Sequence, residues 1–487
     1  MRLSGTTFKL NVANARALTL ACALVLLTAC ASSAPGSSVD PRASGDALLP
    51  TAFDQSTGVS QTVAIDTGEV VAQWWRQLYD QRLNALIDEA MQHNHDVRIA
   101  LDNLALARTL RDGEQLNYRP TTSSSVDANR QRVADASGRP APDNPFDSYS
   151  AGFDASWELD LFGRVRHTVA AANAEVAATQ AELDGVYVSL AAEVAARYIQ
   201  LRGLQQRRSV AQRHSNNLMQ SHELTVQLMN AGMGDALDVQ RALTQLELVR
   251  ARLPALDAQI EQTVRRLSVL TGQAPRTLVQ QMSDVQPLPS IPPSIATGDP
   301  ATLLQRRPDL RRAEHQLSAD IARYQVSVSD LYPRISISGS IGFLATHFAD
   351  LGSGGTLNYL FGPRVSWDAF DMGRVHNRID AQDIRVRMGL ARFEQTLLLA
   401  LEDVENAISA LDRESERQAR LRSAAEASTH ASNLAAERFE AGSDSFLDVL
   451  DAQRTQLEAE DLLTQSETDM ALSVVSVYKA LGGGWQQ

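Results

Sequence analysis

The chain contains few cysteines and few aromatic residues. Its 487 residues include two cysteines, Cys22 and Cys30, and aromatic side chains make up 5% of the sequence. Because both cysteines lie near the N-terminus, the rest of the chain has no thiol for a disulfide or a cysteine-bound metal. A low aromatic content together with abundant Ala, Leu, Gln, Glu and Arg favours long helices.

Long apolar runs and positive charge are also scarce. No apolar run of 18 residues follows residue 30, so the sequence predicts no membrane-spanning helix. The 58 acidic residues outnumber the 45 basic ones, and this balance does not suit a nucleic-acid partner. Phosphate-binding loops, zinc-protease and serine-hydrolase motifs and the dinucleotide fingerprint are all absent. We therefore expect no enzyme activity, no cofactor and no metal site.

Residues 1–29 are typical of a secretory signal peptide. A basic stretch is followed by the apolar run "ALTLACALVLL". The next residues, "LTAC", resemble the lipobox of bacterial lipoproteins, in which cleavage leaves Cys30 as a lipidated first residue. The alternative is an ordinary signal with an incidental cysteine. By the same resemblance, residues 30–75 would form an extended segment anchored in outer-membrane lipid, because no Asp follows the cysteine.

The chain repeats itself. "SWELDLFGRV" (156–165) and "SWDAFDMGRV" (366–375) match in register, and "NAGMGDALDVQRA" matches "EAGSDSFLDVLDA" at the same offset. A third matched pair begins at "HDVRIALDNL" and at "PDLRRAEHQL". The sequence therefore predicts a first repeat over 76–272 and a second over 301–482, joined by a Pro-rich connector over 273–300.

Each repeat contains a long uninterrupted helical pattern. Apolar residues recur every three or four positions over 164–231 and over 374–441, where proline is absent. One unbroken helix of that length spans about 100 Å. Each pattern ends at Ala-Gly, a helix C-cap signal, and return helices are expected over 235–271 and 445–481. Gly232 and Gly442 then lie at the tips of two helical hairpins, and a further helix precedes each β-hairpin.

Upstream of each long helix the apolar period changes from 3.6 to 2. The alternation predicts one β-hairpin over 119–161 and another over 333–371. Such strands fit a soluble sandwich or a transmembrane barrel, but four strands are too few to close a barrel. Several chains would have to share one barrel, and three would supply twelve strands. Trp157 and Trp367 would then lie in the interfacial aromatic girdle, or else be buried at a strand–helix junction.

These motifs resemble those of the TolC-like outer-membrane efflux factors, including the NodT-type lipoproteins. The resemblance covers nearly all of the chain after the signal and is carried by "WELDLFGRVR", "RRPDLRRAEHQL", "LYPRISISGSIG", "GPRVSWDAFDMGR" and "FLDVLDAQRTQLEAE". It implies an α+β membrane protein, a homotrimer whose 12-stranded outer-membrane β-barrel is continuous with a long α-helical barrel in the periplasm. It also implies a periplasmic adaptor and an inner-membrane transporter of RND type as partners.

The resemblance places a periplasmic gate at the hairpin tips. Its constricting carboxylates would be Asp448 and Asp451, with Asp238 on the other hairpin, and the tip glycines would mark the adaptor-docking surface. Asp448 and Asp451 can share one helix face, and a ring of such carboxylates would repel anions. Alternatively, Asp448 caps the helix that begins near Ser445, and Asp238, three residues after Asp235, has the same alternative. Some members carry an arginine at the position of Asp444, where ion pairs hold the closed state together. Such an ionic latch is in doubt here, so the apolar Phe439, Phe446 and Leu450 are expected to contribute more to the closed state.

The expected function is a passive exit duct for small molecules such as drugs in a tripartite efflux system. Two alternatives remain open: a type I protein-secretion duct, and a periplasmic coiled-coil adaptor or structural lipoprotein that forms no pore.

Overall fold

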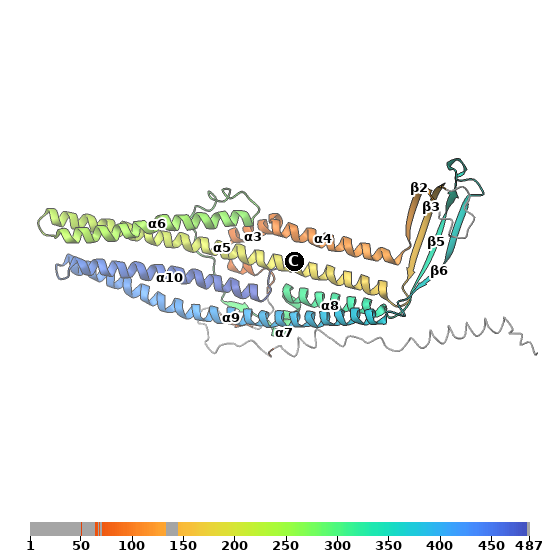
Figure 1. Ribbon diagram of the computed structural model, residues 1–487. Helices are drawn as coiled ribbons and strands as arrows, with labels where there is room; N and C mark the ends of the chain where they lie inside the picture. Colours follow the sequence, from red (N-terminus) through yellow and green to blue (C-terminus); the bar gives the residue numbers. More distant parts are fainter. Residues whose placement is uncertain (1–49, 51–63, 67, 69–70, 133–144, 485–487) are drawn as a thin grey trace, which may run out of the picture.

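The computed structural model describes residue 50 and residues 64–66, 68, 71–132 and 145–484. The predicted signal peptide and Cys30 lie outside the described residues. Figure 1 shows an elongated bundle of helices with a sheet projecting from one end. Among the described residues, no helix is both long and apolar enough to span a bilayer.

Two long helical hairpins form the body of the molecule. The first consists of α5 (Arg164–Asn230) and α6 (Ala236–Leu270), and the second of α9 (Met372–Glu440) and α10 (Phe446–Ala480). The bounds of α5 and α9 lie within two residues of the expected 164–231 and 374–441. Pro254 lies inside α6, which continues through it.

The helix expected before each β-hairpin is divided in two. The four resulting helices are α3 (Gln81–His93), α4 (His95–Gln115), α7 (Pro300–Arg306) and α8 (Pro308–Ser329). Asn94 and Arg307 separate them in extended conformations, with ψ of 135° and 119°. A residue before proline avoids the helical region, which explains the break at Arg307. Asn94 instead accepts hydrogen bonds from the backbone N–H groups of Asp96 and Val97 and so begins a new helix.

The helices lie side by side in a fixed order. α5 packs against α4, α6, α8 and α10, and α9 packs against α8 and α10. The edges of the layer are therefore α4 with α6 on one side and α9 on the other (Figure 1).

Four strands form an antiparallel sheet in the order β2-β3-β5-β6. They are β2 (Thr121–Gln131), β3 (Phe146–Leu159), β5 (Arg334–Ala345) and β6 (Leu357–Ser366). A parallel pair joins β1 (Ala64–Asp66) to β4 (Ser294–Ala296), and the 3₁₀ helices are η1 (Trp74–Leu78), η2 (Leu116–Tyr118) and η4 (Phe348–Asp350).

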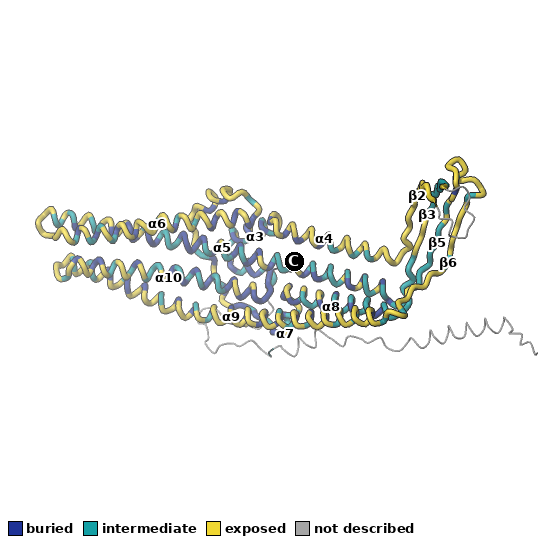
Figure 2. The backbone as a smooth tube through the Cα atoms, viewed as in Figure 1, coloured by how far each residue is buried: buried dark blue, intermediate teal, exposed yellow. Residues whose placement is uncertain are grey.

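The main hydrophobic core lies at the middle of the bundle. There a belt, residues 71–93 and 273–299, packs against all four long helices. Trp74 of the belt is fully buried and stacks on Tyr478 of α10, with ring centroids 5.1 Å apart. The dark blue segments of Figure 2 show this core and a second, narrower one that extends toward the hairpin tips.

Candidate functional site

The two predicted interface tryptophans make the same hydrogen bond at two strand–helix junctions. Trp157 Nε1 donates to the carbonyl oxygen of Tyr118, and Trp367 Nε1 donates to that of Leu331, each at 3.1 Å. Trp157 is half-buried and Trp367 is 53% exposed, so neither is buried at its junction. Each indole thereby ties the end of a strand to the residue at which the preceding helix gives way to the sheet.

The start of α5 is held by acidic side chains. Asp160 accepts hydrogen bonds from the backbone N–H groups of Val165 and Arg166, at 2.9 and 3.0 Å. Glu158 of β3 forms a bidentate pair with Arg164 at 2.7 and 2.5 Å. A carboxylate at a helix N-terminus satisfies unpaired N–H groups and opposes the positive end of the helix dipole. The strand therefore passes into the helix through a rigid corner.

The sheet has one apolar and one polar face. Cross-strand rows on one face are apolar, for example Phe153 beside Ile341, which lies beside Tyr359. The adjacent row on the other face contains Ser123, Asp154 and Ser340 and ends at Leu360 in β6, so that face is mostly polar. Phe153, Ile341 and Tyr359 are more than half exposed. Figure 2 shows that the edge strands β2 and β6 are exposed along most of their length, and neither has a partner on its outer side among the described residues.

The hairpin tips share one turn geometry. Gly232 and Gly442 have φ of 76° and 73°, a left-handed conformation that favours glycine. In the first tip Met233 N–H donates to the carbonyl of Leu228 at 2.9 Å, and in the second Ser443 N–H donates to that of Arg438 at 3.0 Å. Both turns are Schellman motifs, so the tips are set by local sequence.

Asp448 caps α10. Its Oδ2 accepts hydrogen bonds from Ser445 N–H at 3.1 Å and from Ser445 Oγ at 2.7 Å, completing a capping box. These hydrogen bonds lower the pKa of the Asp448 carboxyl below its usual value. The side chain is nonetheless exposed, so its negative charge remains at the tip.

The other two predicted gate carboxylates each pair with an arginine three residues later. Asp238 lies 3.4 Å from Arg241, and Asp451 lies 2.7 Å from Arg454. These arginines were not among the predicted site residues, although the D-x-x-R spacing is visible in "DVQR" and "DAQR". The pairs reduce the net negative charge that the tips present.

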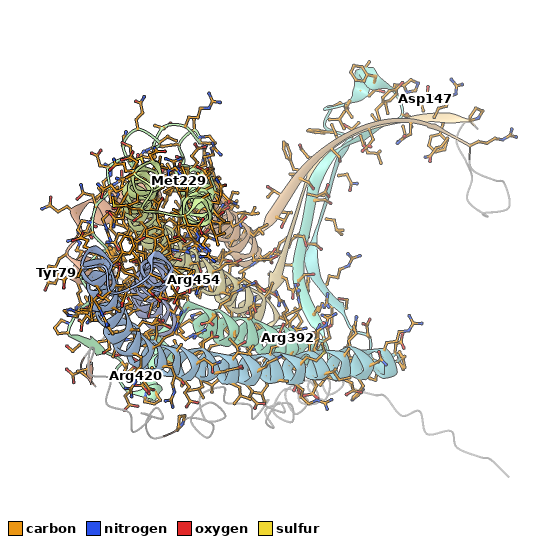
Figure 3. The ribbon with its side chains drawn as sticks, turned by 90° about the vertical axis from the view of Figure 1, so that its left-hand side faces the viewer. Tyr79, Asp147, Met229, Arg392, Arg420 and Arg454 are labelled. Atoms are coloured by element: carbon orange, nitrogen blue, oxygen red, sulfur yellow. The ribbon has the colours of Figure 1, made fainter. Side chains whose placement is uncertain are left out.

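A groove separates the first turns of α6 and α10. Its volume is about 440 Å³, and Leu237, Arg241, Leu447, Asp451 and Arg454 are among its lining residues. Figure 3 looks along the bundle from the tips and shows Met229, near the end of α5, and Arg454 of α10 on separate hairpins. Leu237 and Leu447 are half exposed, so both tips present apolar surface.

The predicted apolar tip residues pack within one chain. Phe439 and Phe446 meet edge to face, 5.5 Å apart, and Phe446 and Leu450 are buried. Asp444, for which the sequence raised the question of an ionic latch, lies 3.4 Å from Arg438 of the same hairpin. Phe439 and its neighbours therefore stabilise the second hairpin, together with residues of α5 and α6.

Comparison with known proteins identifies the protein family in which these features occur. The model of the family described as "Outer membrane efflux protein" matches residues 86–273 and 300–483, which is most of the chain.

The chain belongs to the outer membrane efflux protein family.

This outer membrane efflux protein is 30% identical over 439 residues to the toluene efflux pump outer membrane protein TtgC of Pseudomonas putida, covering 89% of this chain and 90% of TtgC. It is also 30% identical over 428 residues to the outer membrane protein OprJ of Pseudomonas aeruginosa, covering 88% of each. Among solved structures, the outer-membrane channel OprN superposes with a TM-score of 0.84 at 37% identity, over 90% of this chain and 98% of OprN.

The efflux protein carries no evident centre for chemistry in the part of the chain that the structure describes. No group of three or more His, Cys, Asp or Glu side chains there could hold a metal ion. The family is one of outer-membrane channels, and the geometry above consists of a two-faced sheet, long helices and charged tips.

Proposed function

We propose that three copies of this chain form a lipid-anchored exit duct of a tripartite efflux system. In this proposal the four strands of each chain contribute to one 12-stranded β-barrel in the outer membrane, and the helices form a tunnel through the periplasm. The duct is passive and conducts small molecules, because energy would come from a partner.

The open, two-faced sheet carries this proposal. An apolar face with more than half of Phe153, Ile341 and Tyr359 exposed requires a nonpolar surrounding, whereas the serine-rich face suits water. Unpaired edge strands are not tolerated in lipid. Because strand direction alternates across β2-β3-β5-β6, β6 of one copy can pair antiparallel with β2 of the next. Closure by copies of the same chain satisfies every edge.

Barrel size favours three copies over two. Two chains would supply eight strands, and an eight-stranded barrel is filled by its own side chains. Three chains supply twelve strands, which leaves a lumen that can hold water.

The edges of the helical layer support closure as well. Exposed apolar side chains lie on α4, where Ile99, Leu106 and Leu110 are 57–63% exposed, and on α9, where Leu398 and Leu399 are about half exposed. Contact between the α4–α6 edge of one copy and α9 of the next would cover both sets. Burial of each such side chain contributes about 1.5–3 kcal/mol at most.

The strand–helix junctions and the N-terminal cysteine would place the protein in the cell envelope. Trp157 and Trp367 would lie at the periplasmic interface of the membrane, with apolar ring surface and a bonded N–H. Cys30, lipidated after removal of residues 1–29, would anchor the N-terminal segment in the same leaflet.

The tips would face the partners. A periplasmic adaptor would dock around Gly232 and Gly442, in the groove between α6 and α10, and would connect the duct to an inner-membrane transporter of RND type. Asp448, Asp451 and Asp238, repeated by threefold symmetry, would form the narrow ring. Asp448 would then both cap its helix and contribute charge.

The internal repeat would explain why the two halves of the chain contain equivalent hydrogen bonds. Asn94 Nδ2 donates to the carbonyl of Leu270 at 2.9 Å, and Arg307 Nη1 donates to that of Ala480 at 3.0 Å. Both bonds join the start of a helix to the end of the return helix, at matching sequence positions. They support a division into repeats 76–272 and 301–482 with the connector 273–300.

The class of cargo is inferred from the name of a relative and from the width of the proposed lumen. TtgC is named as part of a toluene efflux pump, and a wide passive lumen discriminates weakly. We propose small, apolar or amphipathic molecules as cargo. A type I secretion duct would differ in exporting an unfolded polypeptide, and a coiled-coil adaptor would not conduct.

Two measurements test the proposal together. Ser125→Cys in β2, combined in turn with cysteine at Asn358, Leu360 or Gly362 in β6, should give oxidised species that end at three chains and are strongest for one pairing. Ser125→Cys alone should give two chains at most. The purified protein should conduct ions in planar bilayers. A monomer that neither crosslinks nor conducts would exclude the duct, and mass spectrometry of Cys30→Ser against the parent tests lipidation.

A further inference from the structure

The belt contains a pocket that the duct does not require. Its volume is about 720 Å³, and it lies between the start of α3, the middle of α5 and residues 281–290 of the connector. Tyr79, Tyr198, Arg202 and Asp284 are among its lining residues. Three chain segments that are distant in sequence therefore build one polar cavity.

Arg202 provides a buried positive charge in this pocket. The residue is 3% exposed, and its Nη1 donates to Gln205 Oε1 and to the carbonyl of Asp284, each at 2.8 Å. Its guanidinium carbon lies 4.8 Å from the ring centre of Tyr198. No acceptor faces Nε, and no carboxylate of the described residues lies within ion-pair distance. Because buried charges normally have a counter-charge, this arginine is suited to a carboxylate.

Asp284 provides the opposite charge without neutralising the arginine. Its carbonyl is fixed by Arg202, but its exposed carboxylate has no hydrogen bond or ion pair within the described residues. Asp80, the other carboxylate of the lining, is fully engaged. Its Oδ1 caps α3 and its Oδ2 accepts from Tyr198 Oη at 2.8 Å. The lining also includes Arg82, whose Nη2 donates to Gln281 Oε1 at 2.6 Å. The pocket thus holds charges of both signs, and Arg202 and Asp284 meet through a backbone carbonyl and not through their charged groups.

Tyr79 lies at the rim. Among the described residues it is the one non-glycine residue with positive φ, 51°, and its side chain is 80% exposed. Its N–H donates to the carbonyl of Arg76 at 3.2 Å, and Ser290 N–H donates to that of Leu78 at 3.1 Å, which holds the turn. Strained residues of this kind cluster at binding sites. Figure 3 shows Tyr79 at the outer surface of the bundle, where its ring is available to a ligand.

We propose that this belt pocket binds a zwitterionic amino-acid head group, with the carboxylate on Arg202 and the ammonium on Asp284. A simple anion would be repelled by Asp284 and Asp80, and a simple cation by Arg202 and Arg82, whereas a zwitterion satisfies both signs. The head group could be a free amino acid or the end of a peptide attached to the cell-wall polymer. Only the second source rests on the proposed periplasmic position.

Calorimetric titration of the full-length protein in detergent tests the chemistry. Glycine is the smallest zwitterionic probe, and acetate and methylamine each carry one of its charges. We expect glycine to bind and the other two to show no binding at the same concentration. Equal binding of acetate would overturn the zwitterion assignment, and so would an absence of glycine binding.

Matched variants locate the site. Asp284→Asn should weaken glycine binding at least tenfold, while Asp88→Asn, an exposed acid on α3 outside the pocket, should leave it unchanged. Tyr79→Gly removes the rim ring and adopts the positive φ without strain. Weaker binding by this variant with an unchanged thermal melt would place the ring in the site. Unchanged affinity in Asp284→Asn would contradict the proposal.

Cosedimentation with purified cell-wall sacculi distinguishes the sources. If the protein cosediments with sacculi, and if both added glycine and Asp284→Asn abolish this cosedimentation, the ligand is a cell-wall peptide. If the protein binds glycine but does not cosediment, the ligand is a free amino acid. The bilayer conductance of Asp284→Asn should equal that of the parent, which separates this site from the duct.

Discussion

His214 Nε2 lies 3.2 Å from Oε2 of Glu460, and this contact joins the first helical hairpin to the second. His214 is buried on α5, and Glu460 lies on α10. Other polar contacts follow the same interface: Arg207 with Asp461 at 2.7 and 2.9 Å, Arg213 with Glu460 at 3.1 Å, and Gln453 with Ser221 at 3.2 Å. The two hairpins are therefore fastened together on the side of the core that leads to the tips.

Removal of the Glu460 charge should destabilise the protein at neutral pH but not in acid. The hydrogen bond from His214, more than any other cause, lowers the pKa of Glu460 from 4.5 to about 2. A carboxyl whose folded pKa is depressed stabilises the fold above its unfolded pKa, and this contribution is lost as pH falls through the folded pKa. Glu460→Gln should thus lower the apparent melting temperature at pH 7, and the difference from the parent should close between pH 4.5 and 2.

Circular dichroism melts of detergent-solubilised protein measure this difference. Glu458→Gln, an exposed neighbour on the same helix, is the matched control and should melt like the parent at every pH. A deficit in Glu460→Gln that persists at pH 2 would show that the charge is not its cause.

The helices α5 and α10 pack closely at Gly203. A Cβ atom added there would overlap the side chain of Thr468, which is itself buried. Gly203→Ala should therefore cost about 1–3 kcal/mol through overpacking. Adding Thr468→Ala should restore most of the loss, because the methyl group then has room. Gly113→Ala, with nothing within 4 Å, should be neutral or stabilising by up to about 1 kcal/mol. Additive losses in the double variant would argue against a direct clash.

The indole hydrogen bond at the first strand–helix junction should be measurable. Trp157→Phe leaves the Tyr118 carbonyl without its donor at 3.1 Å, for an expected cost of about 1 kcal/mol. Phe153→Leu on the same strand breaks no hydrogen bond and should change the apparent melting temperature much less. If the two variants had the same apparent melting temperature, the hydrogen bond would make no net contribution to stability.

Arg307 should be among the residues least tolerant of substitution. Its guanidinium is buried and donates to the carbonyls of Ala400 and Ala480 and to the carboxylates of Asp309 and Asp403. The two carboxylates are exposed and can turn to water, but Arg307→Ala removes a donor from both buried carbonyls, which should cost about 2 kcal/mol or more. Arg413→Ala, a 71% exposed arginine of α9, should change stability by less than about 0.5 kcal/mol. Equal effects in thermal melts would rule out this role.

Single-channel recording can separate the gate role of the tip acids from helix capping. Asp448→Asn with Asp451→Asn removes two charges per chain and should raise conductance while reducing any preference for cations. Ser445→Ala weakens the capping box but keeps both charges, so it should leave conductance near that of the parent. If conductance rises in Ser445→Ala alone, helix capping controls how far the channel opens. If conductance changes in neither variant, this ring is not a gate.

Local signals predicted the elements closely. Ala-Gly pairs at 231–232 and 441–442 end the long helices because left-handed residues stop a helix wherever they occur. Pro308 likewise required an extended Arg307, but the division of the preceding helix was missed because the apolar periodicity continues across the break. The mostly polar β2 was a weak strand pattern that pairing with β3 made regular.

The site was less predictable, since its contacts join residues far apart in sequence. The indole of Trp157 could have been placed at an interface, but not its partner 39 residues earlier. Arg202 and Asp284 carry no motif, and only the packing of the connector on α5 brings them together.

The sequence by itself determined two equal helical hairpins, four alternating strands and the capped tips, because each depends on periodicity and turn chemistry within a few residues. The order of the helices, the register that gives the sheet its two faces, and the His214–Glu460 contact were decided by tertiary structure, because they depend on which apolar surfaces cover one another.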